Sequence, residues 1–123
     1  MARGELTSDS AELVLLSVLS EGPQYGYAII KQVAGRSDDR IRLSPGVLYP
    51  LLARLERQGL IAGRWDQVKA DRADPDAPGR KRKWYRLTPK GTRRLAQRIR
   101  AHRSHLALME SFIGRAHPEE GRA

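Results

Sequence analysis

Four segments of the chain carry apolar residues at helical spacing, and three shorter segments have the pattern of strands. Helices are predicted at about 10–19, 26–34, 45–58 and 89–113, and strands at 40–43, 60–68 and 80–88. Stretches rich in Gly, Pro, Ser and Asp separate these segments, and one of them lies between the last two strands. The pattern therefore predicts a mainly α chain with a small sheet, whose last two strands form a hairpin with a long tip.

The third predicted helix has the most regular pattern and holds two prolines. Its leucines recur at i, i+3, i+4 and i+7 and predict one buried stripe, made of Leu48, Leu51, Leu52 and Leu55. Ser44 and Pro45 are a typical N-cap and first helical residue, and Gly59 is placed to end the helix in a left-handed cap. Pro50 stands inside the helix, where a proline costs about 3 kcal/mol. We expect a bend there that tilts the first turn away from the core.

The first two helices have weaker signals. Asp9 is followed three residues later by Glu12, which is a capping-box pattern and predicts a helix that begins at about Ser10. Its residues expected in the core are Leu13, Val14, Leu16 and Leu19. In the second helix the residues at helical spacing are Ala28, Ile29 and Val33.

The last predicted helix follows Thr88 and Pro89 and carries a heptad seam. Six residues with steps of four and three form it: Leu95, Ile99, His102, Leu106, Met109 and Ile113. Pairing with a second copy of the chain would bury this seam, so it predicts a homodimer interface. The alternative is that the helix covers the core of its own protomer.

The element order is that of a winged helix-turn-helix with an added C-terminal dimerisation helix, a mainly α (α+β) fold. The hairpin is the wing in this arrangement. We expect a DNA-binding domain over residues 1–87, a dimerisation helix over 88–114 and a polar tail over 115–123.

Charge narrows the range of partners. The 123 residues include 23 Lys and Arg against 14 Asp and Glu, which gives a formal net charge of +9. A balance this basic in one small domain favours an anionic partner, most often nucleic acid, although basic proteins without such a partner exist. The chain lacks a signal-peptide pattern and an apolar stretch long enough to cross a membrane, so we expect a soluble cytoplasmic protein.

The sequence offers little for catalysis or for a cofactor. It has no cysteine, and its serines stand in no nucleophile-and-base pattern. His102 and His105 have a spacing that can hold a metal ion, but no carboxylate lies at a helpful position nearby. We therefore expect a protein that is not an enzyme and that binds neither a metal nor another cofactor.

Three segments resemble the PadR family, whose regulators are named for the control of phenolic acid decarboxylation. They are "GPQYGYAIIKQV", "SPGVLYPLLARLERQGLI" and "RKWYRLTPKG", and the single short C-terminal helix resembles the smaller PadR subgroup. The resemblance implies a homodimeric repressor that binds double-stranded operator DNA, with a small-molecule effector as a further candidate partner. Tyr25 departs from the family, which usually has histidine before Gly26.

The candidate DNA contacts come from the second helix, the third helix and the base of the wing. They are Tyr25, Tyr27, Lys31, Ser44, Gly46, Tyr49, Pro50, Arg54, Arg80, Lys81, Arg82 and Lys83. Arg54 is expected to reach a guanine edge or a phosphate, and the wing-base cations to contact phosphates. The plainer interpretation is a solvated helix face and a solvated basic loop. Trp65 and Trp84 are expected to pack across the hairpin, or else to stack on an apolar ligand at the dimer interface.

The acidic wing tip supports an alternative function. Asp66, Asp71, Asp74 and Asp76 would repel phosphate, so we expect the tip itself to lie off DNA. The alternative is a winged-helix module that dimerises or sequesters a protein partner without reading DNA.

Overall fold

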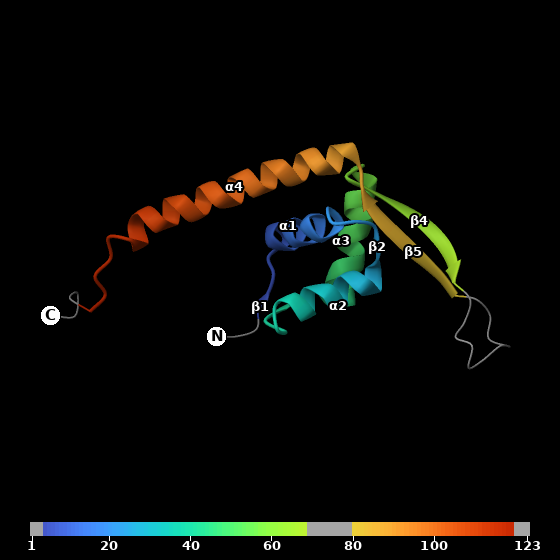
Figure 1. Ribbon diagram of the computed structural model, residues 1–123, viewed down its shortest axis with the longest axis horizontal. Helices are drawn as coiled ribbons and strands as arrows, with labels where there is room; N and C mark the ends of the chain where they lie inside the picture. The colour runs from blue at the N-terminus through green and yellow to red at the C-terminus, as the bar shows by residue number, and fades with distance from the viewer. Residues whose placement is uncertain (1–3, 69–79, 120–123) are drawn as a thin grey trace.

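The computed structural model describes residues 4–68 and 80–119 (Figure 1). The four helices are α1 (Ser8–Leu19), α2 (Gly26–Arg36), α3 (Pro45–Arg57) and α4 (Pro89–Ile113). The five strands are β1 (Gly4–Glu5), β2 (Gln24–Tyr25), β3 (Ile41–Arg42), β4 (Ile61–Val68) and β5 (Arg80–Leu87). The order confirms the winged helix-turn-helix prediction. The acidic wing tip with Asp71, Asp74 and Asp76 lies outside the described residues.

A three-stranded antiparallel sheet in the order β2-β5-β4 forms the wing and its root. In its register Ile61 lies opposite Leu87, and Tyr25 lies opposite Trp84. A separate parallel pair joins β1 to β3. The sequence did not predict β1 or β2, because each is two residues long and β2 lies in a segment whose Gly and Pro indicate only a turn.

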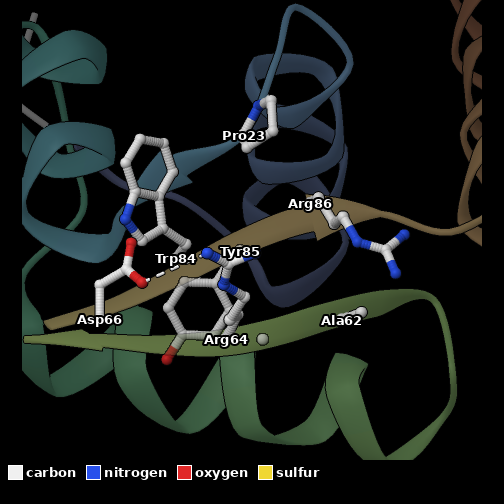
Figure 2. Close-up of a pocket in the computed structure, with 8 residues that line it drawn as sticks. Pro23, Ala62, Arg64, Asp66, Trp84, Tyr85 and Arg86 are labelled. Carbon is white, nitrogen blue, oxygen red and sulfur yellow. Dashed lines mark ion pairs between the residues drawn. The ribbon is translucent and has the colours of Figure 1, made fainter.

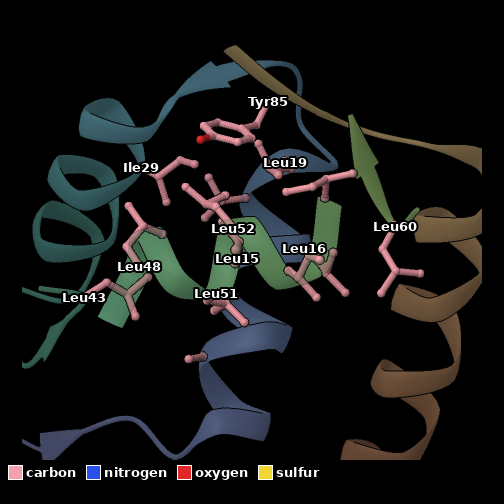
Figure 3. Close-up of a cluster of buried hydrophobic side chains, with 14 of the residues drawn as sticks. Leu15, Leu16, Leu19, Ile29, Leu43, Leu48, Leu51, Leu52, Leu60 and Tyr85 are labelled. Atoms are coloured by element: carbon pink, nitrogen blue, oxygen red, sulfur yellow. The ribbon is translucent and has the colours of Figure 1, made fainter. Parts of the chain in front are cut away.

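The core lies where α1, α2 and α3 meet beneath the sheet (Figure 3). The predicted α3 stripe is confirmed, since Leu48, Leu51, Leu52 and Leu55 are all buried. Leu16 and Leu19 of α1 are buried as predicted, whereas Leu13 and Val14 are only partly buried at the edge of the core. Burial of each large aliphatic side chain contributes about 1.5–3 kcal/mol, so this leucine cluster dominates the stability of the domain.

The start of α1 differs from the prediction. Thr7 is the N-cap, and its hydroxyl accepts a hydrogen bond from the backbone N–H of Ser10 at 3.2 Å. Asp9 and Glu12 therefore do not form a capping box. Glu12 is only 2% exposed and faces arginines of other helices. Its role is therefore to form ion pairs with those helices and not to cap α1.

Helix α3 begins and ends as the sequence predicts. Ser44 has extended N-cap angles, although its hydroxyl makes no capping bond, and Pro45 is the first helical residue. Gly59 has a φ of 75°, and the N–H of Leu60 donates to the carbonyl of Leu55 at 3.0 Å. This is a Schellman motif, in which glycine adopts the left-handed angles that a side chain would oppose. The helix continues through Pro50 without a break.

Helix α4 starts against the end of α3 and then leaves the globular part of the molecule. The Thr88 hydroxyl donates to the Gly59 carbonyl at 2.6 Å and accepts from the N–H of Gly91 at 3.0 Å. Gly91 sits so close to the Leu60 carbonyl that an added Cβ would overlap it. From this root α4 runs over α1 and projects beyond it (Figure 1).

Candidate nucleic-acid interface

A groove of about 660 Å³ opens between the start of α2, the exposed face of α3 and the wing. It is lined by Tyr25, Gly26, Tyr27, Tyr49, Trp65, Arg82, Lys83 and Tyr85. Five of these residues are among the candidate DNA contacts from the sequence. The fold therefore gathers the start of α2, Tyr49 of α3 and both wing strands on one concave surface, which we call the interface groove.

Tyr49 is the centre of the groove. Its ring lies so close to α2 that a Cβ added to Gly26 would stand 2.9 Å from Tyr49 Cε1. Only glycine allows this approach, which explains the Tyr-Gly-Tyr sequence at the start of α2. Tyr49 is nevertheless 45% exposed, so α2 fixes one face of the ring while the rest is open to a ligand. Tyr85 lies deeper in the groove, and burial raises the pKa of its hydroxyl.

Lys83 is held by the protein itself. Its ammonium donates to Glu56 Oε1 at 2.7 Å, and this hydrogen bond is the main cause of its raised pKa. The same ammonium lies 5.5 Å from the centre of the Trp65 ring. Lys83 thus ties β5 to α3 across the groove, and its charge is already partly compensated by Glu56.

Arg82 lies at the wing base and forms no ion pair with another described residue. Its side chain is exposed, and its guanidinium lies 5.6 Å from the centre of the Tyr25 ring. Tyr25 packs in turn against Trp84, with 4.2 Å between ring centres. Arg82 therefore extends from a rigid aromatic pair into the mouth of the groove. Arg80 and Lys81 lie at the start of β5, and their side chains are outside the described residues.

Trp65 is one of three groove residues, with Gly26 and Tyr85, that are not among the predicted DNA contacts. It was expected to pack across the hairpin or against a helix, but it is 63% exposed and lies beside Lys83. The signal that would have found it is its register. Trp65 lies opposite Lys83 and two pairs from Tyr85, and therefore on the sheet face that looks toward α3.

Trp84 lies on the opposite sheet face, where a second cavity of about 570 Å³ opens (Figure 2). Figure 2 shows the Arg64–Asp66 ion pair and Arg86 around it. The indole Nε1 of Trp84 is buried and has no hydrogen-bond partner within the described ranges. Trp84 packs against Tyr25 of β2, which is neither across the hairpin nor on a helix.

The beginning of α3 is open to solvent beside the interface groove. Ser44, Gly46 and Pro50 are all exposed, and the Ser44 hydroxyl makes no capping bond. Lys31 of α2 is also exposed, with its ammonium 5.2 Å from the centre of the Tyr27 ring. The positive end of the α3 dipole and Lys31 thus border the same aromatic surface.

Arg54 does not lie with these residues. One guanidinium nitrogen is 3.7 Å from Glu12 Oε1, so the side chain turns toward α1. The expected reach of Arg54 to a base edge is therefore not supported by its position. The sequence could not show this, because an exposed arginine on a helix and one paired with a distant carboxylate look alike.

The predicted seam of α4 divides into two parts. Leu95 is buried in the core of its own protomer, and Ile99 packs against that core. His102 and the later seam residues are exposed, with Leu106 at 53%, Met109 at 41% and Ile113 at 59%. Leu108 and Phe112, which the heptad pattern leaves out, are also exposed at 58% and 69%. The first half of the helix therefore covers the core of its own protomer, and its second half presents an exposed apolar face.

Within the part of the chain that the structure describes, no helix is both long and apolar enough to cross a membrane. The same described residues contain no group of three or more His, Cys, Asp or Glu side chains suited to a metal ion.

The chain matches the model of the transcriptional regulator PadR-like family over residues 15–97, about two thirds of its length. This range includes α2, α3, both long strands and the root of α4. It contains every groove residue.

Solved structures agree with this match. A PadR family transcriptional regulator from Eggerthella lenta is 32% identical, with a TM-score of 0.65 over 88% of this chain and 84% of that chain. A PadR family regulator from Clostridium difficile is 29% identical, with a TM-score of 0.67 over 83% of this chain and 96% of that chain.

The transcriptional regulator YqjI of Escherichia coli is 38% identical over 55 residues, which are 45% of this chain and 27% of that protein.

Proposed function

Because the chain belongs to the PadR-like family of transcriptional regulators, we propose that it is a homodimeric repressor that binds an inverted-repeat operator. Each protomer presents the start of α3 to a major groove and the base of its wing to the flanking phosphates. The observation that carries this proposal is the interface groove, where aromatic rings and the exposed Arg82 border the open end of α3.

The groove has the chemistry of a DNA contact. Tyr27, Tyr49 and Trp65 are exposed aromatic side chains that can pack on sugars and donate hydrogen bonds to phosphates. Arg82 and Lys31 add positive charge at the rim, where phosphates would lie. Lys83 contributes by fixing the wing to α3 through Glu56, which holds the two contacting elements at one spacing.

The exposed half of α4 supports the dimer. Its five large apolar residues would be costly to leave in water, and a second copy of the same helix offers a matching surface. A twofold dimer places its two α3 helices on half-sites one or two turns of DNA apart, roughly 10–21 bp.

For regulation, we propose that the dimer represses its target and that a small ligand relieves the repression. Family membership supports this part of the proposal. A reporter gene behind the selected operator should be silenced by the wild-type protein. A reporter that the protein activates would contradict repression and leave DNA binding intact.

Selection of bound DNA from a random pool is the direct test. We expect the selected sequences to contain an inverted repeat, and a mobility-shift titration to show two protomers on each operator. Failure of the protein to retain even random DNA at low salt would contradict the proposal. That result would favour the alternative, a winged-helix module that binds a protein partner.

A further inference from the structure

A buried carboxylate joins three helices on the side of the domain away from the interface groove. Glu12 of α1 is 2% exposed, and Arg98 Nε of α4 donates to its Oε2 at 2.7 Å. Arg94 of α4 donates to the same oxygen at 3.5 Å. Arg54 of α3 lies 3.7 Å from the other oxygen, Oε1. One anion thus stands among three cations, two from α4 and one from the helix that we place on DNA.

The charges make Glu12 necessary to this arrangement. Without its carboxylate the guanidinium groups of Arg54, Arg94 and Arg98 would face one another with no anion buried between them. Like charges at this separation repel, and the repulsion acts between α3 and α4. The hydrogen bond to Glu12 also raises the pKa of Arg98. Asp9 touches only Arg98, at 3.3 Å, and is itself exposed, so it cannot replace Glu12.

Glu12 is a polar attachment of α4 beyond its root. At the root, Thr88 and Gly91 lie against the end of α3. Leu95 and Ile99 pack on the core farther along the helix. Apolar packing permits small rotations, whereas ion pairs to a buried carboxylate add a directional contact that sets the tilt of the helix. Ile113 is 22 residues beyond Gly91 on α4, a distance of about 33 Å along the axis. A change in tilt of about 10° at the root would therefore move the far end by about 6 Å.

We propose that Glu12 is a positioning residue that sets the angle between α3 and α4, and so the spacing of half-sites that the dimer accepts. This inference rests on the proposed function, because the exposed half of α4 joins the two protomers there. Glu12 itself touches no DNA in this arrangement. It fixes the distance between the two α3 helices, and a dimer with a fixed distance binds one operator spacing better than its neighbours.

The test compares two variants with a matched control. Glu12→Gln keeps the shape of the side chain and removes the anion, and Arg98→Met removes its strongest partner while keeping an apolar stem. Asp9→Asn is the control, because it neutralises a carboxylate on the same helix that also contacts Arg98. Each protein is titrated against operators whose half-sites are constant and whose spacing changes by single base pairs.

We expect both variants to bind the isolated half-site as the wild type does. Their preference for the best spacing over the adjacent spacings should fall by about two- to thirtyfold. Asp9→Asn should keep the wild-type preference. An unchanged preference in Glu12→Gln or Arg98→Met would overturn the inference, while a wild type that binds no DNA would instead overturn the proposed function.

A second measurement needs no DNA. The chain has no cysteine, so Ala53→Cys on the exposed face of α3 gives one site for a spin label in each protomer. The distance between the two labels of a dimer should have one narrow distribution. Glu12→Gln and Arg98→Met should shift or broaden it, and Asp9→Asn should not. A narrow, unmoved distribution in both variants would contradict the role of Glu12 even if their melting temperatures fell.

Discussion

The cations near the interface groove have different partners. These partners determine which cation is available to bind a phosphate. Lys83 is 2.7 Å from Glu56, and Arg54 turns toward the buried Glu12. Arg82 is exposed beside the Tyr25 ring and forms no ion pair within the described ranges. A phosphate can therefore recruit Arg82 without breaking an ion pair, whereas Lys83 would have to leave Glu56 first.

Arg82→Gln should weaken binding to operator and to random DNA alike, because it removes one phosphate contact. The salt dependence of log K should become shallower by about 1. Lys83→Gln is the matched change, and it should mainly lower stability, by about 1 kcal/mol, because Glu56 loses its partner. Titrations at several salt concentrations and thermal melts separate the two effects. A salt slope that Arg82→Gln leaves unaltered would remove this residue from the interface.

Pro50 makes a separate prediction. It cannot donate to the Gly46 carbonyl, and its ring crowds that turn, so Pro50→Ala should raise stability by up to about 3 kcal/mol. If the proline tilts the start of α3 toward DNA, operator affinity should fall about tenfold, or about 1.4 kcal/mol. Melting curves and mobility-shift titrations measure the two quantities. Constant affinity with a raised melting temperature would mean that a tilt of the start of α3 by Pro50 has no part in binding.

Among the secondary-structure elements, α3 and α4 carry most of the function, and each has two different faces. The leucine stripe of α3 fixes the helix in the core, while Tyr49 and the first turn stay open. The first half of α4 is part of the core through Leu95, and its second half is not. The same heptad thus serves first the protomer and then, in our proposal, the dimer.

Leu52→Ala should cost about 2–5 kcal/mol of stability, because Leu52 is fully buried among the leucines of α1 and α3. Chemical unfolding measures this loss. Gln97→Ala, at an exposed position on α4, serves as the control and should change stability by less than about 0.5 kcal/mol. Equal effects of the two changes would contradict the central place of Leu52 in the core.

Leu106→Glu should give monomers, because it puts a charge in the middle of the apolar half of α4. Light scattering measures the mass, and circular dichroism should show that the helix content of the protomer is retained. Gln97→Glu adds the same charge on α4 at an exposed position outside the predicted seam and should leave the dimer intact. Persistent dimers of Leu106→Glu would show that the chains pair through another surface.

For the molecule as a whole, the sequence pattern correctly predicted the features that depend on residues close together in the chain. Short-range spacing and backbone angles determine where two helices begin and end. They account for the start of α3 at Pro45, its end before Gly59 and the N-cap of α4 at Thr88. They also account for the leucine stripe and the extent of α4. The family segments correctly placed most of the groove residues next to one another. The two-residue strands could not be predicted, because they exist only through pairing with distant partners.

The sequence failed mainly where a charged or aromatic residue has a long-range partner. Glu12 and Arg98 are 86 residues apart, and no spacing rule relates them. Arg54 was therefore assigned to DNA and Glu12 to a helix cap. Trp65 was assigned to packing, because the face that it occupies depends on the register between β4 and β5. The three-dimensional structure replaces the cap assignment of Glu12 with tertiary pairing, turns Arg54 toward Glu12 and leaves Trp65 exposed beside Lys83.

The contact between Gly91 and the Leu60 carbonyl also sets how the protein tolerates mutation. Any side chain at position 91 would overlap backbone, and backbone cannot rotate away as a flexible side chain can. A Cβ at Gly35, in contrast, would meet nothing within 4 Å. A library randomised at both positions and screened for folded protein should thus recover almost only glycine at 91 and many residues at 35. The junction between domain and helix is then far less tolerant of substitution than Gly35 of α2, although it is not part of the surface that we place on DNA.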